Sequence, residues 1–130
     1  MKPVPEYSAV TEPYWQAAAR GRFMLPRCND CERVHYPPRR WCPHCWRSGL
    51  SWVEVSGRAR VLTFSVVHQP PSADFEVPYV LAVVKLEEGP QMMCNIVDCT
   101  PSEVTVDMEV AVTFETRGDI TMPQFMPARG

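Results

Sequence analysis

The sequence predicts a mainly β protein with an N-terminal helical arm, a rubredoxin-like zinc ribbon and a C-terminal five-stranded OB-type barrel with one short helix. Three observations predict this class: two Cys-x2-Cys pairs, alternating apolar residues from Trp52 onward, and a length of 130 residues, which favours one domain with a small satellite. We assign the arm to residues 1–26, the ribbon to residues 27–50, and the barrel with a C-terminal tail to residues 51–130.

The arm contains one short predicted helix. Thr11 can cap it, Pro13 suits its first turn, and Gly21 can end it. A helix of about two turns is marginal alone in water. We therefore expect it to pack against its own domain.

The cysteine pairs form the sharpest motif. Cys28 and Cys31 make one pair, ten residues follow, and Cys42 and Cys45 make the second pair. Zinc prefers four soft ligands in a tetrahedron, and each pair can supply two thiolates from one tight turn. We predict that all four bind one structural Zn²⁺, which supplies folding energy that this segment lacks. An iron site of the rubredoxin type has the same ligands and stays an alternative.

Other chemistries of these cysteines are weaker interpretations. The Cys-Pro-His-Cys tetrapeptide at 42–45 also occurs in oxidising thioredoxin-fold proteins, but that chemistry needs a helix beginning at the motif, and here strands follow. Haem attachment needs a histidine after the second cysteine of a pair, where this chain has Glu32 and Trp46. Cys94 and Cys99 do not repeat the spacing, so we interpret them as reduced thiols outside the metal site.

Alternation of apolar and polar residues predicts the strands of the barrel. Gly89 and Pro90 mark a turn, and Thr100 with Glu103 forms a capping box that predicts a short helix. Proline content favours a loop over residues 69–78 and an extended tail over residues 122–129. The predicted strands cover residues 62–66, 79–86, 92–97 and 110–114, with a further short strand at 52–53.

Charge divides the chain into two unequal halves. Residues 1–60 carry ten basic and five acidic residues, a net charge of +5, whereas residues 61–130 carry three basic and ten acidic residues, a net charge of −7. The basic half suggests an anionic partner. A single-stranded nucleic-acid-binding module is the alternative function for a ribbon and a barrel, but an acidic barrel does not favour it.

The sequence also limits location and chemistry. No apolar run approaches the roughly 20 residues that cross a bilayer, and the first residues lack a signal-peptide core, so we expect a cytoplasmic protein. Motifs for a nucleophile elbow, a phosphate loop or paired catalytic carboxylates do not occur. We therefore expect no catalytic residues in this chain.

A series of short motifs runs in order along nearly the whole chain. They are Pro-Tyr-Trp at 13–15, Gly-Arg-Phe at 21–23, the two cysteine pairs, and the segments at 34–39, 52–57, 66–68, 78–80 and 123–125. In this order the chain resembles a family of zinc-ribbon plus OB-fold proteins associated with acyl-CoA enzymes, long catalogued as a domain of unknown function.

Three positions depart from the family pattern. Relatives often have glycine after the second cysteine of each pair, where this chain has Glu32 and Trp46, and a positive φ is harder to adopt without glycine. Asp107 stands where glycine is common in the turn before a barrel strand, and aspartate tolerates that conformation.

The resemblance implies a non-catalytic accessory subunit or domain of a thiolase-superfamily enzyme that acts on acyl-CoA: a thiolase, an acyltransferase or a steroid side-chain aldolase. It implies a hetero-oligomer built on a thiolase dimer, in some cases with a hot-dog-fold hydratase. The acidic barrel and the lack of a long apolar run predict no nucleic-acid and no membrane partner. Arginine binds phosphate bidentately, and Arg39, Arg40, Arg58 and Arg60, near the ribbon and the first barrel strand, are the candidate contacts to the phosphates of coenzyme A. Arginines that face solvent or a protein partner are the alternative interpretation.

Overall fold

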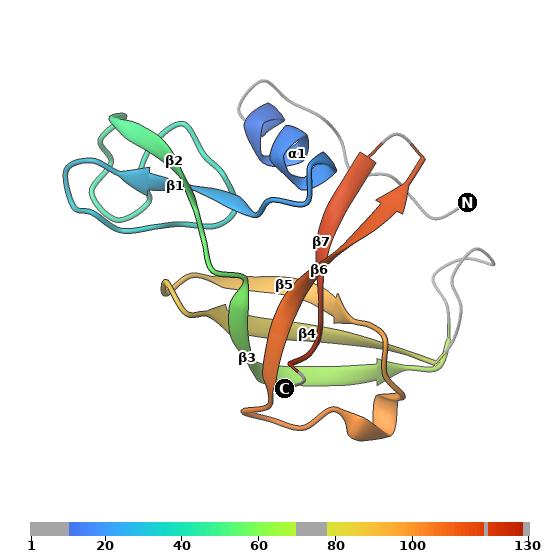
Figure 1. The fold of residues 1–130 in the computed structure, drawn as a ribbon. Helices are drawn as coiled ribbons and strands as arrows, with labels where there is room; N and C mark the ends of the chain where they lie inside the picture. The colour runs from blue at the N-terminus through green and yellow to red at the C-terminus, as the bar shows by residue number, and fades with distance from the viewer. Residues whose placement is uncertain (1–10, 70–77, 119, 129–130) are drawn as a thin grey trace.

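The computed structural model describes residues 11–69, 78–118 and 120–128 and confirms the mainly β fold (Figure 1). One helix opens the described chain, a two-stranded sheet follows, and five further strands form a closed barrel. The elements are α1 (Glu12–Ala19), β1 (Met24–Cys28), β2 (Leu50–Glu54), β3 (Arg58–Val67), β4 (Tyr79–Leu86), β5 (Gln91–Ile96), η1 (Pro101–Glu103), β6 (Glu109–Arg117) and β7 (Ile120–Pro127).

The helix α1 begins and ends where its sequence indicates. Thr11 occupies the N-cap, although its hydroxyl accepts a hydrogen bond from the Trp15 indole at 3.2 Å and makes no bond to the helix backbone. Gly21 has φ +73°, and its N–H donates to the Ala18 carbonyl at 2.9 Å, which closes the C-terminus. The predicted short helix after residue 100 is confirmed as the single 3₁₀ turn η1.

The strands β1 and β2 pair in an antiparallel ladder that carries the ribbon. Met24 faces Glu54 at one end of this ladder, and Cys28 faces Leu50 at the other. The strand β2 thus runs across residues 50 and 51, where the sequence placed the start of the barrel region. Gly57, at φ +79°, lets the chain turn from the ribbon into β3.

The barrel closes in the order β3-β4-β5-β7-β6, with β6 returning to β3. The extended tail expected over residues 122–129 was wrong, because β7 pairs with β6 along its whole length and is the fifth strand. The prolines of β7 argued against a strand in the sequence, because proline cannot donate a hydrogen bond to a strand ladder. The structure tolerates these prolines because β7 pairs with β5 at one position, Ile96 opposite Phe125, so few backbone N–H groups are needed on that side. Residues 70–77 of the predicted 69–78 loop lie outside the described residues.

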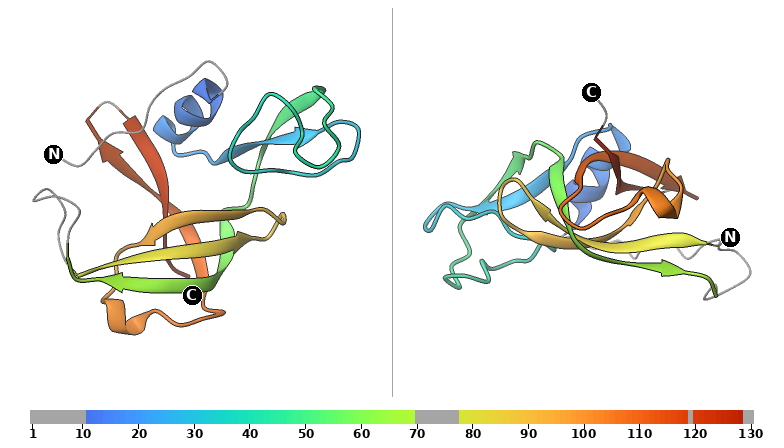
Figure 2. Two further views of the ribbon diagram at one scale, coloured as in Figure 1. Left: turned by 180° about the vertical axis from the view of Figure 1, so that it is seen from behind. Right: turned by 90° about the horizontal axis from the view of Figure 1, so that it is seen from below.

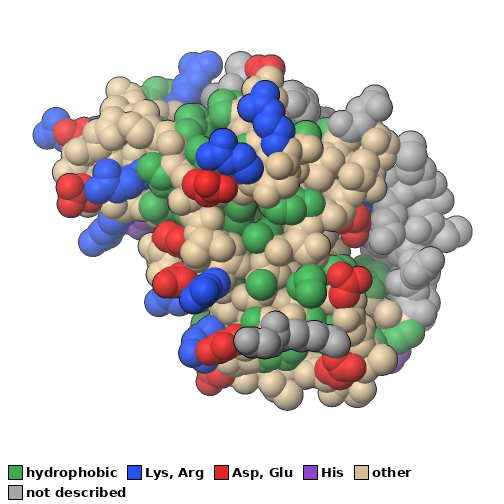
Figure 3. Space-filling model, viewed as in Figure 1, with side chains coloured by type: hydrophobic (Ala, Val, Ile, Leu, Met, Phe, Trp, Pro, Cys, Tyr) green, Lys and Arg blue, Asp and Glu red, His purple; other side chains and the backbone are tan. Residues whose placement is uncertain are grey.

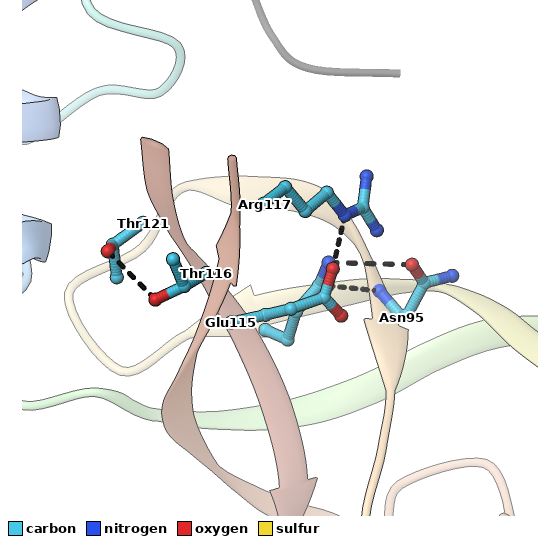
Figure 4. Close-up of polar contacts among 6 residues, drawn as sticks. Asn95, Glu115, Thr116, Arg117 and Thr121 are labelled. Carbon is cyan, nitrogen blue, oxygen red and sulfur yellow. Dashed lines mark hydrogen bonds and ion pairs between the residues drawn. The ribbon is translucent and has the colours of Figure 1, made fainter. Parts of the chain in front are cut away.

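Side chains complete the seam between β5 and β7. The buried Gln124 accepts a hydrogen bond from the Asn95 backbone N–H at 2.7 Å, and Asn95 donates from its amide to the Val80 carbonyl at 3.0 Å. Figure 4 shows Asn95 beside the β6–β7 hairpin, where Glu115 pairs with Arg117. The seam therefore satisfies backbone groups that strand pairing leaves open.

The ribbon, the arm and the barrel share one hydrophobic core. The ring of Phe23 packs edge-on against Tyr14 and against Phe125, each with centroids 6.3 Å apart. The two views in Figure 2 and the view in Figure 1 place α1 between the ribbon and the β6–β7 hairpin, and α1 contacts both β1 and β7. These aromatic contacts hold the ribbon in a defined position on the barrel. Among the described residues, no helix has the length and apolar character to span a membrane.

Candidate metal centre

The first cysteine turn begins at the last residue of β1. The N–H of Glu32 donates to the Cys28 carbonyl at 2.9 Å, and the Cys28 N–H donates to the Arg33 carbonyl at 2.9 Å. The Cys31 N–H points at the Cys28 sulfur at 3.4 Å. This closed turn is the geometry in which backbone amides stabilise metal-bound thiolates.

The second turn repeats this pattern in a segment without regular secondary structure. The N–H of Trp46 donates to the Cys42 carbonyl at 2.8 Å, and the Cys42 N–H donates to the Arg47 carbonyl at 2.9 Å. The His44 N–H lies 3.4 Å from the Cys42 sulfur. Because this segment is a turn and not the start of a helix, it lacks the feature that thioredoxin-type chemistry requires.

The four predicted sulfurs come together in one cluster. All lie within 4.8 Å of one another, with Cys28 to Cys45 and Cys31 to Cys42 at 3.5 Å each. A tetrahedral ion with metal–sulfur bonds of 2.3 Å requires sulfur–sulfur distances of about 3.8 Å. The donor set and its spacing therefore fit one four-coordinate, thiolate-bound metal ion.

Crowding of the thiols separates their pKa values. The hydrogen bond from the Cys31 N–H lowers the pKa of Cys28 to about 7. The Arg47 amide lowers the pKa of Cys45, but lost solvation and the neighbouring thiols outweigh it and raise that pKa to about 12. Four thiolates within 4.8 Å of one another repel each other, so the full set needs a bound cation to balance its charge.

The three departures from glycine all fall at positive φ. Glu32 has φ 66°, Trp46 has φ 64°, and Asp107 has φ 67°. The expected left-handed positions are thus confirmed, and this chain occupies them with larger residues. Such positions disfavour a bulky side chain most, so Trp46 is the least expected of the three.

The four candidate arginines occupy two separate places. Arg58 and Arg60 line a groove of about 830 Å³ over β3, β4 and β6, which Lys85 also lines. Arg60 is engaged there by the Glu109 carboxylate at 3.0 Å. Arg39 and Arg40 are exposed on the loop between the cysteine turns and are not among the residues lining the groove. Figure 3 shows basic side chains over the ribbon and α1 and a further group at the edge of the barrel below the ribbon.

The exposure of two tryptophans was not predicted from the sequence. Trp46 is 77% exposed and Trp41 is 53% exposed, and they flank the Cys42–Cys45 turn. The available signal concerned Trp46, which follows the second cysteine of its pair, where the family pattern that the sequence resembles often has glycine. Sequence alone does not show which way such a side chain points.

A four-cysteine ribbon packed on a closed OB-type barrel defines a class of two-part β proteins. Two family models match the chain in succession: the rubredoxin-like zinc ribbon domain of ChsH2 over residues 15–51 and the C-terminal OB-fold domain of ChsH2 over residues 52–115. The chain belongs to this ChsH2 family, whose relatives also include DUF35-domain proteins.

Three comparisons illustrate the family. The chain is 33% identical over 129 residues to a probable enoyl-CoA hydratase alpha subunit of Thermomonospora curvata, covering 98% of this chain and 40% of that protein. It is 43% identical over 91 residues to a DUF35 domain-containing scaffold protein of Methanocaldococcus jannaschii, covering 68% of this chain and 64% of that protein. A chain of the solved Ltp2-ChsH2(DUF35) aldolase superposes with a TM-score of 0.86 and 33% identity, covering 97% of this chain and 100% of that chain.

Proposed function

We propose that this chain is a non-catalytic accessory subunit or domain that binds and supports a thiolase-superfamily enzyme acting on acyl-CoA substrates. The likeness to the ChsH2 chain of an aldolase complex carries the proposal, because it extends over both the ribbon and the barrel. A hetero-oligomer built on a thiolase dimer, in some relatives with a hot-dog-fold hydratase, is the assembly we expect, in the reducing cytoplasm that free thiols require.

The metal centre supports a structural role. Four thiolates complete the coordination of a tetrahedral ion and leave no position open for substrate. We propose Zn²⁺ as the ion. Metal analysis of the purified chain should find one zinc per chain, whereas a coloured protein with a one-electron redox wave would identify iron instead.

We further propose that the four arginines contribute to coenzyme A binding in the complex. In the groove, Arg58 and Lys85 have no carboxylate partner among the described residues, whereas Arg60 pairs with Glu109. Arg39 and Arg40 can act only if the enzyme brings coenzyme A to the ribbon loop. Arg58→Ala and the double variant Arg39→Ala/Arg40→Ala therefore distinguish the two places by their effect on KM for the acyl-CoA, with Arg22→Ala as an exposed control.

The direct test is an activity assay of the thiolase-fold subunit with and without this chain. Condensation, thiolysis and retro-aldol cleavage of acyl-CoA esters are measured in parallel. We expect at least one activity to depend on the chain and the chain alone to have none. An enzyme that is equally soluble and active without the chain would contradict the proposal.

A further inference from the structure

Trp46 combines two features that do not favour stability. Its side chain is the most exposed of the large apolar residues described, at 77%, and its backbone holds φ 64°. Glycine would occupy this position without strain. Exposed apolar side chains and strained backbones persist where a function requires them, so Trp46 is a candidate contact residue.

The first cysteine turn provides an internal reference. Glu32 holds the corresponding position at φ 66°, and its carboxylate lies 3.5 Å from the Arg27 guanidinium. That side chain has a partner within the ribbon. Trp46 has no ring contact within the described part of the chain, so its indole is available to another molecule.

The neighbours of Trp46 add a second aromatic ring and positive charge. Trp41 precedes Cys42 and is 53% exposed, and the hydrogen bond from Cys42 to the Arg47 carbonyl closes these residues into one turn. The exposed guanidinium group of Arg47 makes no hydrogen bond or ion pair among the described residues. Tryptophan and arginine are the side chains most enriched at the energetic centres of protein interfaces.

We propose that the knuckle surface, formed by Trp41, Trp46 and Arg47, docks the chain onto its enzyme subunit. The inference rests on the proposed function and names the surface that performs it. The partner presents an apolar recess for the indoles with acidic side chains beside it, because the unpaired Arg47 needs a counter-charge. A polyanion is disfavoured, since the barrel half of the chain carries a net charge of −7.

The test compares Trp46→Gly with Glu32→Gly. Both substitutions relieve a left-handed position next to a metal ligand, so neither should lower the thermal midpoint or the metal content. Binding to the purified thiolase-fold subunit is measured by biolayer interferometry. Trp46→Gly and Trp41→Ala should each weaken binding at least tenfold, whereas Glu32→Gly should match the wild type. Arg47→Glu should slow association and reduce its salt dependence.

The outcomes distinguish failure of the docking surface from failure of the proposed function. Wild-type affinity in Trp46→Gly would overturn the docking surface while leaving the proposed function intact. Absence of binding by the wild type would overturn the proposed function and this surface with it. Binding of a fluorescent single-stranded oligonucleotide, or self-association in sedimentation, that disappears in Trp46→Gly would assign the surface to nucleic acid or to a second copy and overturn the inference.

Discussion

The ribbon and the barrel reach a folded state by different physical means. Between residues 28 and 50 the buried side chains are Cys28, His35, Pro38 and Cys42, which form no aliphatic core. The barrel instead buries a continuous apolar interior, including Val61, Val84, Val110 and Phe125. Burial of this kind is worth about 1.5 to 3 kcal/mol for each large aliphatic or aromatic side chain.

Because of this difference, the residues that stabilise the ribbon need not be the residues that contact a partner. A ribbon held by a metal ion needs few buried side chains, so its exposed residues can be chosen for contact with a partner. The barrel supplies a rigid platform, and the rings of Tyr14, Phe23 and Phe125 connect the two parts. The comparison predicts that loss of the metal ion unfolds the cysteine-bearing loops of the ribbon with limited effect on the barrel strands.

Metal removal should produce the largest effect and confine it to the ribbon. Structural zinc sites contribute about 10 to 16 kcal/mol to folding, more than the ribbon can recover from packing. After treatment with a chelator, or in Cys28→Ser, hydrogen exchange should become fast over residues 28–50 and stay slow in the barrel strands. Cys94→Ala is the matched control and should retain one metal ion per chain. Equal loss of hydrogen-exchange protection in the ribbon and the barrel would mean that the metal ion does not stabilise the ribbon alone.

Truncation of Phe125 should have the next largest effect and should act on the barrel and its junction. This ring is fully buried and contacts Phe23, so Phe125→Ala should lower the free energy of unfolding by about 3 to 5 kcal/mol in urea denaturation. Phe114→Ala, at a partly buried position, should lose less. A loss below about 1 kcal/mol for Phe125→Ala would mean that this contact does not organise the junction.

Gly57 tests the connection between the parts. A Cβ atom there would lie 2.4 Å from Cγ1 of Val112, and the backbone holds φ +79°. Gly57→Ala should therefore reduce the free energy of unfolding by about 2 to 4 kcal/mol, from strain and overpacking together. Gly21→Ala shares the left-handed φ, +73°, without any atom near the added methyl, and should lose about 1 kcal/mol. Similar losses in both variants would exclude close packing at Gly57.

The smallest predicted effect concerns Cys94 in alkaline solution. Burial raises the pKa of this thiol from 9.0 to about 12. Between those values the thiol ionises only in the unfolded chain, so the free energy of unfolding falls as pH rises above 9, by about 1 kcal/mol at pH 10. Denaturation of Cys94→Ala under reducing conditions should show a shallower alkaline decline. An unchanged decline would place its cause elsewhere, for example at the buried Tyr14, whose pKa is also raised.

Sequence reasoning succeeded where a local chemical rule determines the structure. Spacing alone predicted the cysteine cluster, and period-two alternation predicted β3 to β6, because both patterns act within a few residues. The positive φ at Glu32, Trp46 and Asp107 agrees with the glycine positions of the family pattern that the sequence resembles.

Sequence reasoning failed where tertiary contacts override local preference. Pro123 and Pro127 argued against a strand, yet β7 closes the barrel because β6 pairs with it and Phe125 fills the core. The outward direction of Trp46 is another tertiary property. The separation of Arg39 and Arg40 from the groove that holds Arg58 and Arg60 depends on how the ribbon docks, which no local pattern encodes.

The proposed role as the accessory part of a thiolase-fold enzyme requires a stable complex with that enzyme. The most direct measurement is affinity purification of the tagged chain from its native cell, followed by mass spectrometry and light scattering of the isolated complex. We predict a thiolase-fold subunit in stoichiometric amount, with a mass that corresponds to a hetero-oligomer built on the enzyme dimer. Recovery of the chain alone, or of nucleic acid in place of an enzyme, would contradict the proposed accessory role.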